Sequence, residues 1–177
     1  MGDPGDPGDN AEHLLALIDR GLDRSVRLAG LILADRAEAE DAVQEAAIRA
    51  WRSAEFLRRQ EDAQAWLDRI LVNICRDRLR RRARIRFVEL VEEPAGPVVR
   101  DPFRDALDRD EMLCALDTLD ADQRVVVVLH YWADLTLAAI AERTGWPVGT
   151  VKSRLHQALE RLRRRLAEAA ALEVLAR

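Results

Sequence analysis

The 177-residue sequence predicts an all-α protein: two small helical domains joined by a flexible acidic linker, the second containing a helix-turn-helix. Apolar residues recur at helical spacing in nearly every segment, and only one short run resembles a strand. Gly and Pro interrupt the chain at its beginning and near its middle. We expect a disordered tail over residues 1–11, a first domain over 12–86, a linker over 87–107 and a second domain over 108–177.

The charges are segregated along the chain, although the net charge is only -4. Residues 46–86 hold 12 Arg against 5 acidic residues, whereas residues 87–122 hold 3 Arg against 11 acidic residues. Residues 123–177 return to 9 basic residues against 5 acidic ones. Two basic zones separated by an acidic one predict two contacts with a polyanion.

The composition argues against several classes of protein. Apolar residues make up 49% of the chain, but no run approaches the roughly 18 consecutive apolar residues of a membrane span. The acidic opening MGDPGDPGDN is unlike a signal peptide, so we expect a cytoplasmic protein. Cys75 and Cys114 have neither disulfide nor zinc spacing, and we expect both to be buried small hydrophobic residues.

The first domain begins with helices expected over Glu12–Leu33 and Glu38–Arg52. The face of the second helix that we expect to be buried carries Val43, Ala46, Ala47, Ala50 and Trp51. Its far side carries Asp41, Gln44, Glu45, Ile48 and Arg52. An isoleucine among carboxylates fits the apolar centre of a protein-binding face with a charged rim, but it also fits an ordinary exposed residue.

A third helix is expected over Ala63–Arg86, with an apolar stripe formed by Trp66, Leu67, Ile70, Leu71 and Ile74. Another side of this helix carries a ridge formed by Arg69, Asn73, Arg76 and Arg80, which we call the arginine ridge. Arginine pairs with phosphate and stacks on bases, and Asn can recognise a base edge. The ridge therefore predicts contact with a polyanion. A surface helix made soluble by Arg, or one lying on a membrane, is the alternative.

The second domain opens with the strand-like run Val125–Val128, which we nevertheless expect to be helical through Tyr131. Asp120 and Gln123 have the spacing of an N-terminal capping pair. The sequence shows no plausible strand nearby that could pair with the valines. His130 beside them is expected to be a packed or capping residue.

Residues 135–166 read as a helix, a tight turn and a longer helix. Thr136 can cap the first helix, Gly145 can supply the turn, and Pro147 stands where a first helical residue is favoured. The apolar face of the longer helix carries Val151, Leu155, Ala158, Leu159 and Leu162. Its small, polar face carries Gly149, Thr150, Ser153 and Gln157, flanked by Lys152, Arg154 and His156. Such a face suits a DNA major groove, and a helical hairpin with a solvated polar face is the alternative.

Three segments together resemble the second and fourth conserved regions of bacterial sigma factors. They are EAEDAVQEAAIRAWR (residues 38–52), AWLDRILVNICRDRLRRR (65–82) and PVGTVKSRL (147–155). The short two-domain layout is similar to that of the extracytoplasmic-function (ECF) group. The resemblance spans roughly residues 12–86 and 108–170 of the chain.

The resemblance implies a subunit that binds core RNA polymerase and directs promoter recognition, DNA melting and transcription initiation. The face implied to bind the clamp helices of the polymerase β′ subunit is Asp41, Gln44, Glu45 and Ile48. The residues implied to act on the −10 element are Arg69, Asn73, Arg76 and Arg80. Those implied to act on the −35 element are Thr150, Lys152, Ser153, Arg154 and Gln157.

The resemblance also implies that the apolar side of the second domain binds the polymerase β flap. A loop over residues 57–64 would capture a flipped base of the non-template strand. A dedicated anti-sigma factor is implied as a further partner, which could hold the protein at the membrane. Many family members carry a basic residue where this chain has Gln157, and the loop residues Arg58, Arg59 and Gln60 are not diagnostic. No promoter sequence therefore follows.

Two other classes of function compete with this one. A stand-alone helix-turn-helix regulator would bind DNA as a dimer, but the first half shows no ligand or phosphoacceptor signature. An enzyme is disfavoured because His13, His130 and His156 are scattered and because no catalytic set, metal-binding spacing or Gly-rich phosphate loop appears. We expect no catalytic residue, no metal and no cofactor.

Overall fold

The computed structural model describes residues 7–53, 63–92 and 114–175, and these residues contain helices and no strand. They fall into two compact units, which are described separately. The first unit runs to Asp77 and includes Glu142–Gly145, and the second comprises Arg78–Ala141 and Trp146–Arg177. The described helices contain no stretch long and apolar enough to cross a membrane.

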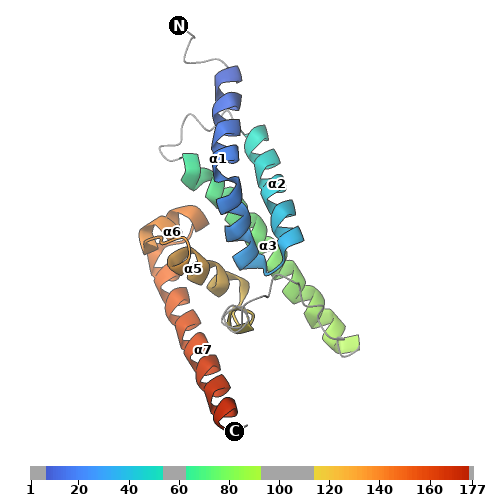
Figure 1. Cartoon of the computed structure of the whole chain (residues 1–177), viewed down its shortest axis with the longest axis vertical. Helices are drawn as coiled ribbons and strands as arrows, with labels where there is room; N and C mark the ends of the chain where they lie inside the picture. Colours follow the sequence, from blue (N-terminus) through green and yellow to red (C-terminus); the bar gives the residue numbers. More distant parts are fainter. Residues whose placement is uncertain (1–6, 54–62, 93–113, 176–177) are drawn as a thin grey trace. The chain divides into compact units, whose positions relative to one another are not determined.

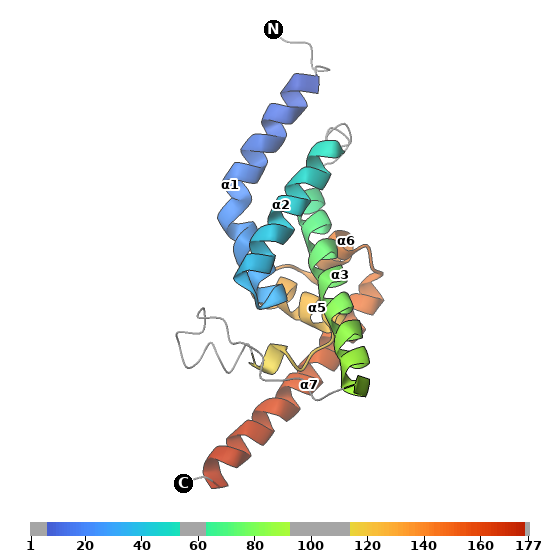
Figure 2. The same ribbon diagram turned by 90° about the vertical axis from the view of Figure 1, so that its right-hand side faces the viewer.

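The first two helices form a hairpin. Helix α1 spans Pro7–Leu33 and helix α2 spans Arg36–Arg52, and both views show them side by side (Figures 1 and 2). Ala34 adopts a left-handed conformation with φ 55°, and its N–H donates to the carbonyl of Gly30. Asp35 then caps α2, because its carboxylate accepts the N–H of Glu38 at 2.8 Å. The connection between the helices is therefore only two residues long.

Helix α3 spans Ala63–Glu92 and packs its first half against the hairpin. Leu14 of α1, Ala50 of α2 and Leu67 of α3 form one buried cluster. The stripe predicted on α3 is confirmed, because Leu67, Leu71 and Ile74 are buried while Trp66 and Ile70 are half-buried. The last six residues of α3 reach into the expected linker, and its remaining residues, 93–107, lie outside the described part of the chain.

A buried carboxylate, Asp68, ties α1 to α3. Its side chain is 1% exposed. Both nitrogens of the Arg24 fork donate to it, at 2.8 and 2.9 Å, and Gln64 donates to it at 2.9 Å. Paired, charge-assisted hydrogen bonds of this kind offset the cost of burying the carboxylate.

The second unit is built on helix α5, which spans Ala121–Tyr131. The predicted capping pair is confirmed: Asp120 accepts the N–H of Gln123 at 2.9 Å, and the Gln123 side chain accepts the N–H of Asp120 at 3.4 Å. The run of valines is helical and fully buried, as expected. His130 is half-buried in the last turn of α5, and its Nδ1 lies 2.9 Å from the carbonyl oxygen of Leu135, in the segment that follows this helix.

Helix α5 packs against helix α7, which spans Val148–Leu175. The buried residues of this unit include Leu116, Leu119 and Leu129, with Val151 and Ala158 of α7. Arg124 of α5 is also buried, and Asp117 accepts a hydrogen bond from it at 2.7 Å. Burial lowers the pKa of Arg124 below its ordinary value, and the contact with Asp117 opposes that shift.

Three expectations differ from the structure. Helix α1 begins at Pro7, inside the segment expected to be a disordered tail, and residues 1–6 lie outside the described part of the chain. Cys75 is buried as expected, but Cys114 is exposed, because Ala115, Leu116 and Leu119 occupy the interior beside it. Trp51 is exposed rather than buried, because small residues already fill the packed side of α2, ending with Ala50.

The Asp68 contact leads to a test of stability. Replacing Asp68 with Ala should lower the free energy of unfolding of the first unit by about 1–3 kcal/mol, because the partners lose a buried acceptor. The half-exposed Arg24 can regain water, but the buried Arg143, which donates to the same carboxylate at 3.2 Å, cannot do so as readily. Thermal unfolding followed by circular dichroism measures the effect. The exposed Asp23 on α1 is the matched control, and Asp23→Ala should change stability by less than about 0.5 kcal/mol. Equal stabilities of the two variants would contradict the assignment.

Candidate nucleic-acid interface

The predicted helix-turn-helix is present in the structure. Helix α6 spans Leu137–Thr144, and Thr136 caps it by accepting the N–H of Ala139 at 3.2 Å. Gly145 adopts φ +73°, which only glycine takes without strain, and so it allows the sharp turn. The carbonyl of Pro147 accepts the N–H groups of Thr150 and Val151 at 2.9 and 3.1 Å, which starts α7.

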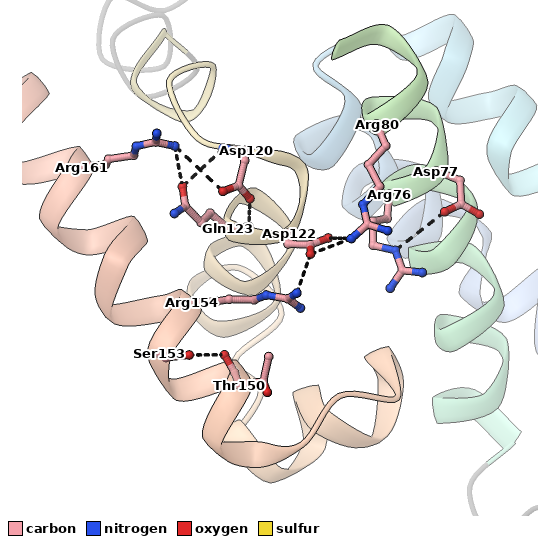
Figure 3. A network of polar contacts seen from close by, with 10 residues as sticks. All are labelled: Arg76, Asp77, Arg80, Asp120, Asp122, Gln123, Thr150, Ser153, Arg154 and Arg161. Carbon is pink, nitrogen blue, oxygen red and sulfur yellow. Dashed lines mark hydrogen bonds and ion pairs between the residues drawn. The ribbon is translucent and has the colours of Figure 1, made fainter. Parts of the chain in front are cut away.

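The two faces predicted for α7 are also present. Val151 and Ala158 are fully buried on the inner face. Lys152, Ser153 and Gln157 are exposed, and Thr150 is half-buried. Ser153 donates its hydroxyl to the carbonyl of Thr150 at 3.0 Å, and the hydroxyl oxygen keeps its capacity to accept (Figure 3). His156 is exposed beside them. The first turns of α7 thus present short or polar side chains to solvent.

Arg154 differs from its neighbours on α7. Its side chain is only 26% exposed, and its Nη2 lies 2.7 Å from the carboxylate of Asp122 on α5 (Figure 3). Its guanidinium carbon lies 3.8 Å from the centre of the Trp146 ring, in a cation–π arrangement. The structure therefore separates Arg154 from the exposed residues with which the sequence grouped it.

The arginine ridge follows α3, but its four members differ in accessibility. Arg69 and Arg80 are exposed, whereas Asn73 and Arg76 are half-buried. Arg76 Nε lies 3.8 Å from the carboxylate of its neighbour Asp77. Within the second unit, Arg80 donates to both oxygens of Asp122, at 2.9 and 2.8 Å (Figure 3). The ridge thus holds two exposed arginines, of which Arg80 is paired with Asp122, and an asparagine amide between them.

The far side of α2 presents a mixed apolar and polar face. Asp41 and Gln44 are exposed and Glu45 is half-buried. Ile48 is 54% exposed and Trp51 is 50% exposed. Sequence reasoning missed Trp51, although its place three residues after Ile48 puts both on one side of a helix. An exposed isoleucine and tryptophan, rimmed by carboxylates, have the composition of a protein-binding surface.

Two further expectations concern other parts of the chain. Most of the loop expected to capture a base, including Arg58, Arg59 and Gln60, lies outside the described residues. Within the described part of the chain, no group of three His, Cys, Asp or Glu side chains could hold a metal ion.

Comparisons with known proteins place these faces in two family regions. Residues 17–85 match the family model of sigma-70 region 2, and residues 109–162 match that of sigma-70 region 4. The first match contains α2 and most of the arginine ridge helix, and the second contains the helix-turn-helix. The two regions occur in the order expected from the sequence.

Individual relatives agree with this match. The chain is 38% identical over 148 residues to the ECF RNA polymerase sigma factor SigL of Mycobacterium tuberculosis, covering 81% of each protein. It is 34% identical over 157 residues to the ECF sigma factor SigE of Mycolicibacterium smegmatis, covering 86% of this chain but 61% of that protein.

Solved structures show the same fold. The sigma factor RpoE from Bartonella quintana, in complex with the anti-sigma factor NepR, matches with a TM-score of 0.66 and 26% identity. That match covers 90% of this chain and 97% of the other. CnrH, solved in complex with the cytosolic domain of CnrY, has the same fold with a TM-score of 0.64 at 22% identity. Both family regions match in the expected order, and the match to SigL covers 81% of each protein. The chain therefore belongs to the ECF RNA polymerase sigma factors.

Proposed function

We propose that this protein is a promoter-recognition subunit of RNA polymerase, with no catalysis of its own. The observation that carries the proposal is the separation of three surfaces on three helices. An apolar face with an acidic rim lies on α2, an arginine ridge lies on α3, and an exposed polar face lies on α7. One surface suits a protein partner and the other two suit a polyanion.

The face on α2 is the proposed contact with the clamp helices of the polymerase β′ subunit. It comprises Asp41, Gln44, Glu45 and Ile48, to which the structure adds Trp51. Large exposed apolar side chains supply most of the binding energy in such interfaces, and aromatic residues are enriched among them. Asp41 and Glu45 supply polar groups beside these apolar side chains, and Glu45 is paired with Arg49.

The ridge on α3 is the proposed contact with the −10 element. Arg69 is exposed, Arg80 is exposed while paired with Asp122, and Asn73 carries the only side-chain amide on the ridge. An amide can both donate to and accept from a base edge, whereas arginine mainly supplies charge to the backbone. We assign base reading to Asn73 and phosphate contacts to Arg69, Arg76 and Arg80.

The exposed face of α7 is the proposed contact with the −35 element. Lys152 supplies a charge, and Ser153 and Gln157 supply hydroxyl and amide groups for bases or phosphates. Thr150 stands at the start of the same face. The apolar side of this domain is the proposed site for the β flap. We further propose that the protein acts in the cytoplasm and is held inactive by an anti-sigma factor.

The α2 surface is tested by a charge placed at its centre. Ile48→Arg should weaken binding to core polymerase by about 30-fold or more, because truncating or disrupting an interface anchor typically costs about 2 kcal/mol. Competition against a second sigma factor for limiting core polymerase measures the affinity. Leu15 on α1 is equally exposed at 54%, so Leu15→Arg is the matched control and should bind normally. Unchanged binding of Ile48→Arg would rule out this surface.

The arginine ridge is tested by the salt dependence of open-complex formation. Arg76→Ala and Arg80→Ala should each lower the slope of log K against log salt by about one unit, the loss of one phosphate contact. Arg20→Ala, an exposed arginine on α1, should leave the slope unchanged. Asn73→Ala should instead alter preference within the −10 element. Wild-type activity of all three ridge variants on both duplex and pre-melted templates would make the ridge a solubility feature.

Dependence on polymerase separates a sigma factor from a stand-alone regulator. The free protein should bind duplex promoter DNA weakly and with little sequence preference, because two weak contacts reinforce each other only when their geometry is fixed. The holoenzyme should bind specifically. Anisotropy titrations at fixed, near-physiological salt, with and without core polymerase, measure the difference. Tight binding of the free protein to a palindrome as a dimer would favour the regulator.

A further inference from the structure

Arg154 occupies the inner side of α7 rather than its open face. It follows Val151 by three residues and precedes Ala158 by four, and both of these are fully buried. Residues three and four apart lie on one side of a helix. Lys152 and Ser153 point elsewhere, because each residue turns the helix by about 100°. The position of Arg154 in the sequence therefore directs its side chain toward α5.

The guanidinium of Arg154 is held from two directions. Asp122, in the first turn of α5, lies 2.7 Å from its Nη2, and the Trp146 ring lies 3.8 Å from its central carbon. Its Nη1 is buried and makes no hydrogen bond to any described residue. To reach a DNA phosphate, Arg154 would have to leave both the carboxylate and the ring. A charge-assisted hydrogen bond to a largely buried carboxylate resists that exchange.

A second arginine on α7 reaches the same end of α5. Arg161 lies seven residues after Arg154, and its Nη1 donates to the Gln123 side chain at 3.0 Å. It also lies 4.0 Å from the carboxylate of Asp120. Two arginines spaced by two helical turns thus contact the first turn of α5 (Figure 3). Contacts at two heights along α7 resist rotation of that helix about its own axis.

We propose that Arg154 is a positioning residue, which fixes the rotation of the recognition helix through Asp122 and Trp146 and does not itself contact DNA. The inference rests on the proposed role of α7 at the −35 element. A fixed rotation keeps Lys152, Ser153 and Gln157 directed outward. Base reading depends on this geometry, because bidentate contacts tolerate little error in orientation. Non-specific attraction to phosphate depends on it much less.

The test uses holoenzyme assembled from core polymerase and the full-length chain, bound to a promoter library randomised only in the −35 segment. For the selected sequence, two quantities are measured: its affinity relative to a scrambled −35 segment, and the salt slope of binding. Arg154→Gln and Asp122→Asn should each reduce the affinity ratio by about tenfold, comparable to one mismatched base pair. Neither should change the salt slope.

Lys152→Gln is the matched control, since it removes a charge on the open face of the same helix. It should lower the salt slope by about one unit. The double variant Arg154→Gln with Asp122→Asn should lose no more discrimination than either single variant, because the two residues act through one contact.

Several outcomes would overturn the inference. A salt slope lowered by about one unit in Arg154→Gln would make Arg154 a phosphate contact. Stronger DNA binding by Asp122→Asn with discrimination intact would make Asp122 a competitor of DNA. Additional loss in the double variant would also contradict a shared role. If circular dichroism shows that Arg154→Gln does not fold, the affinity ratio and salt slope of Asp122→Asn alone test the inference. Should the wild-type holoenzyme select no −35 sequence while still binding core polymerase, −35 recognition itself fails and this inference fails with it.

Discussion

Ion pairs with a few carboxylates hold several of this chain's arginine side chains in place, and a guanidinium held in this way is less available to a ligand. Arg24 is bound to Asp68, Arg124 to Asp117 and Arg154 to Asp122. A charge removed from water is costly unless a partner and hydrogen bonds compensate it, so these arginines belong to the architecture. Arg69 and Lys152, by contrast, are exposed and accessible to phosphate. In a chain with 28 Lys and Arg, residue type alone therefore does not identify a DNA contact.

The third surface differs from the other two in its apolar content. Ile48 and Trp51 are exposed on α2, which also carries Asp41 and Glu45, and Glu45 is paired with Arg49. The ridge on α3 and the open face of α7 carry mainly positive or neutral polar groups. Exposed apolar side chains suit a protein partner, whereas positive and polar groups suit a polyanion. The net charge of only -4 does not reveal that the three surfaces differ in composition.

Local features of the fold were predictable from the sequence because their hydrogen bonds join residues close together in the chain. Thr136, the Asp120–Gln123 pair and Gly145 each do what their spacing indicates. Four consecutive valines favour a strand by propensity, yet they form a helix because the cap and the tertiary packing outweigh that preference.

Features that depend on contacts between residues far apart in the sequence were harder to predict. Nothing near Asp68 indicates that Arg24, 44 residues earlier, will neutralise it. Trp51 was assigned to the interior because helical spacing grouped it with Ala47 and Ala50, but smaller residues already fill the buried side of α2. Arg154 was grouped with its polar neighbours by residue type, although its spacing from Val151 and Ala158 indicates the inner side. The roles of the DNA-contacting and polymerase-contacting residues remain predictions.

The two-residue connection between α1 and α2 has a consequence for how this protein could be altered. The connection consists only of Ala34, in its left-handed conformation, and Asp35, which caps α2. Because this connection is short, a shift of α1 also moves α2. The pair is therefore a natural unit for exchange between related proteins. A graft that takes α2 alone would separate the partner-binding side chains from the helix that sets their angle. A graft that takes the whole hairpin would preserve that angle.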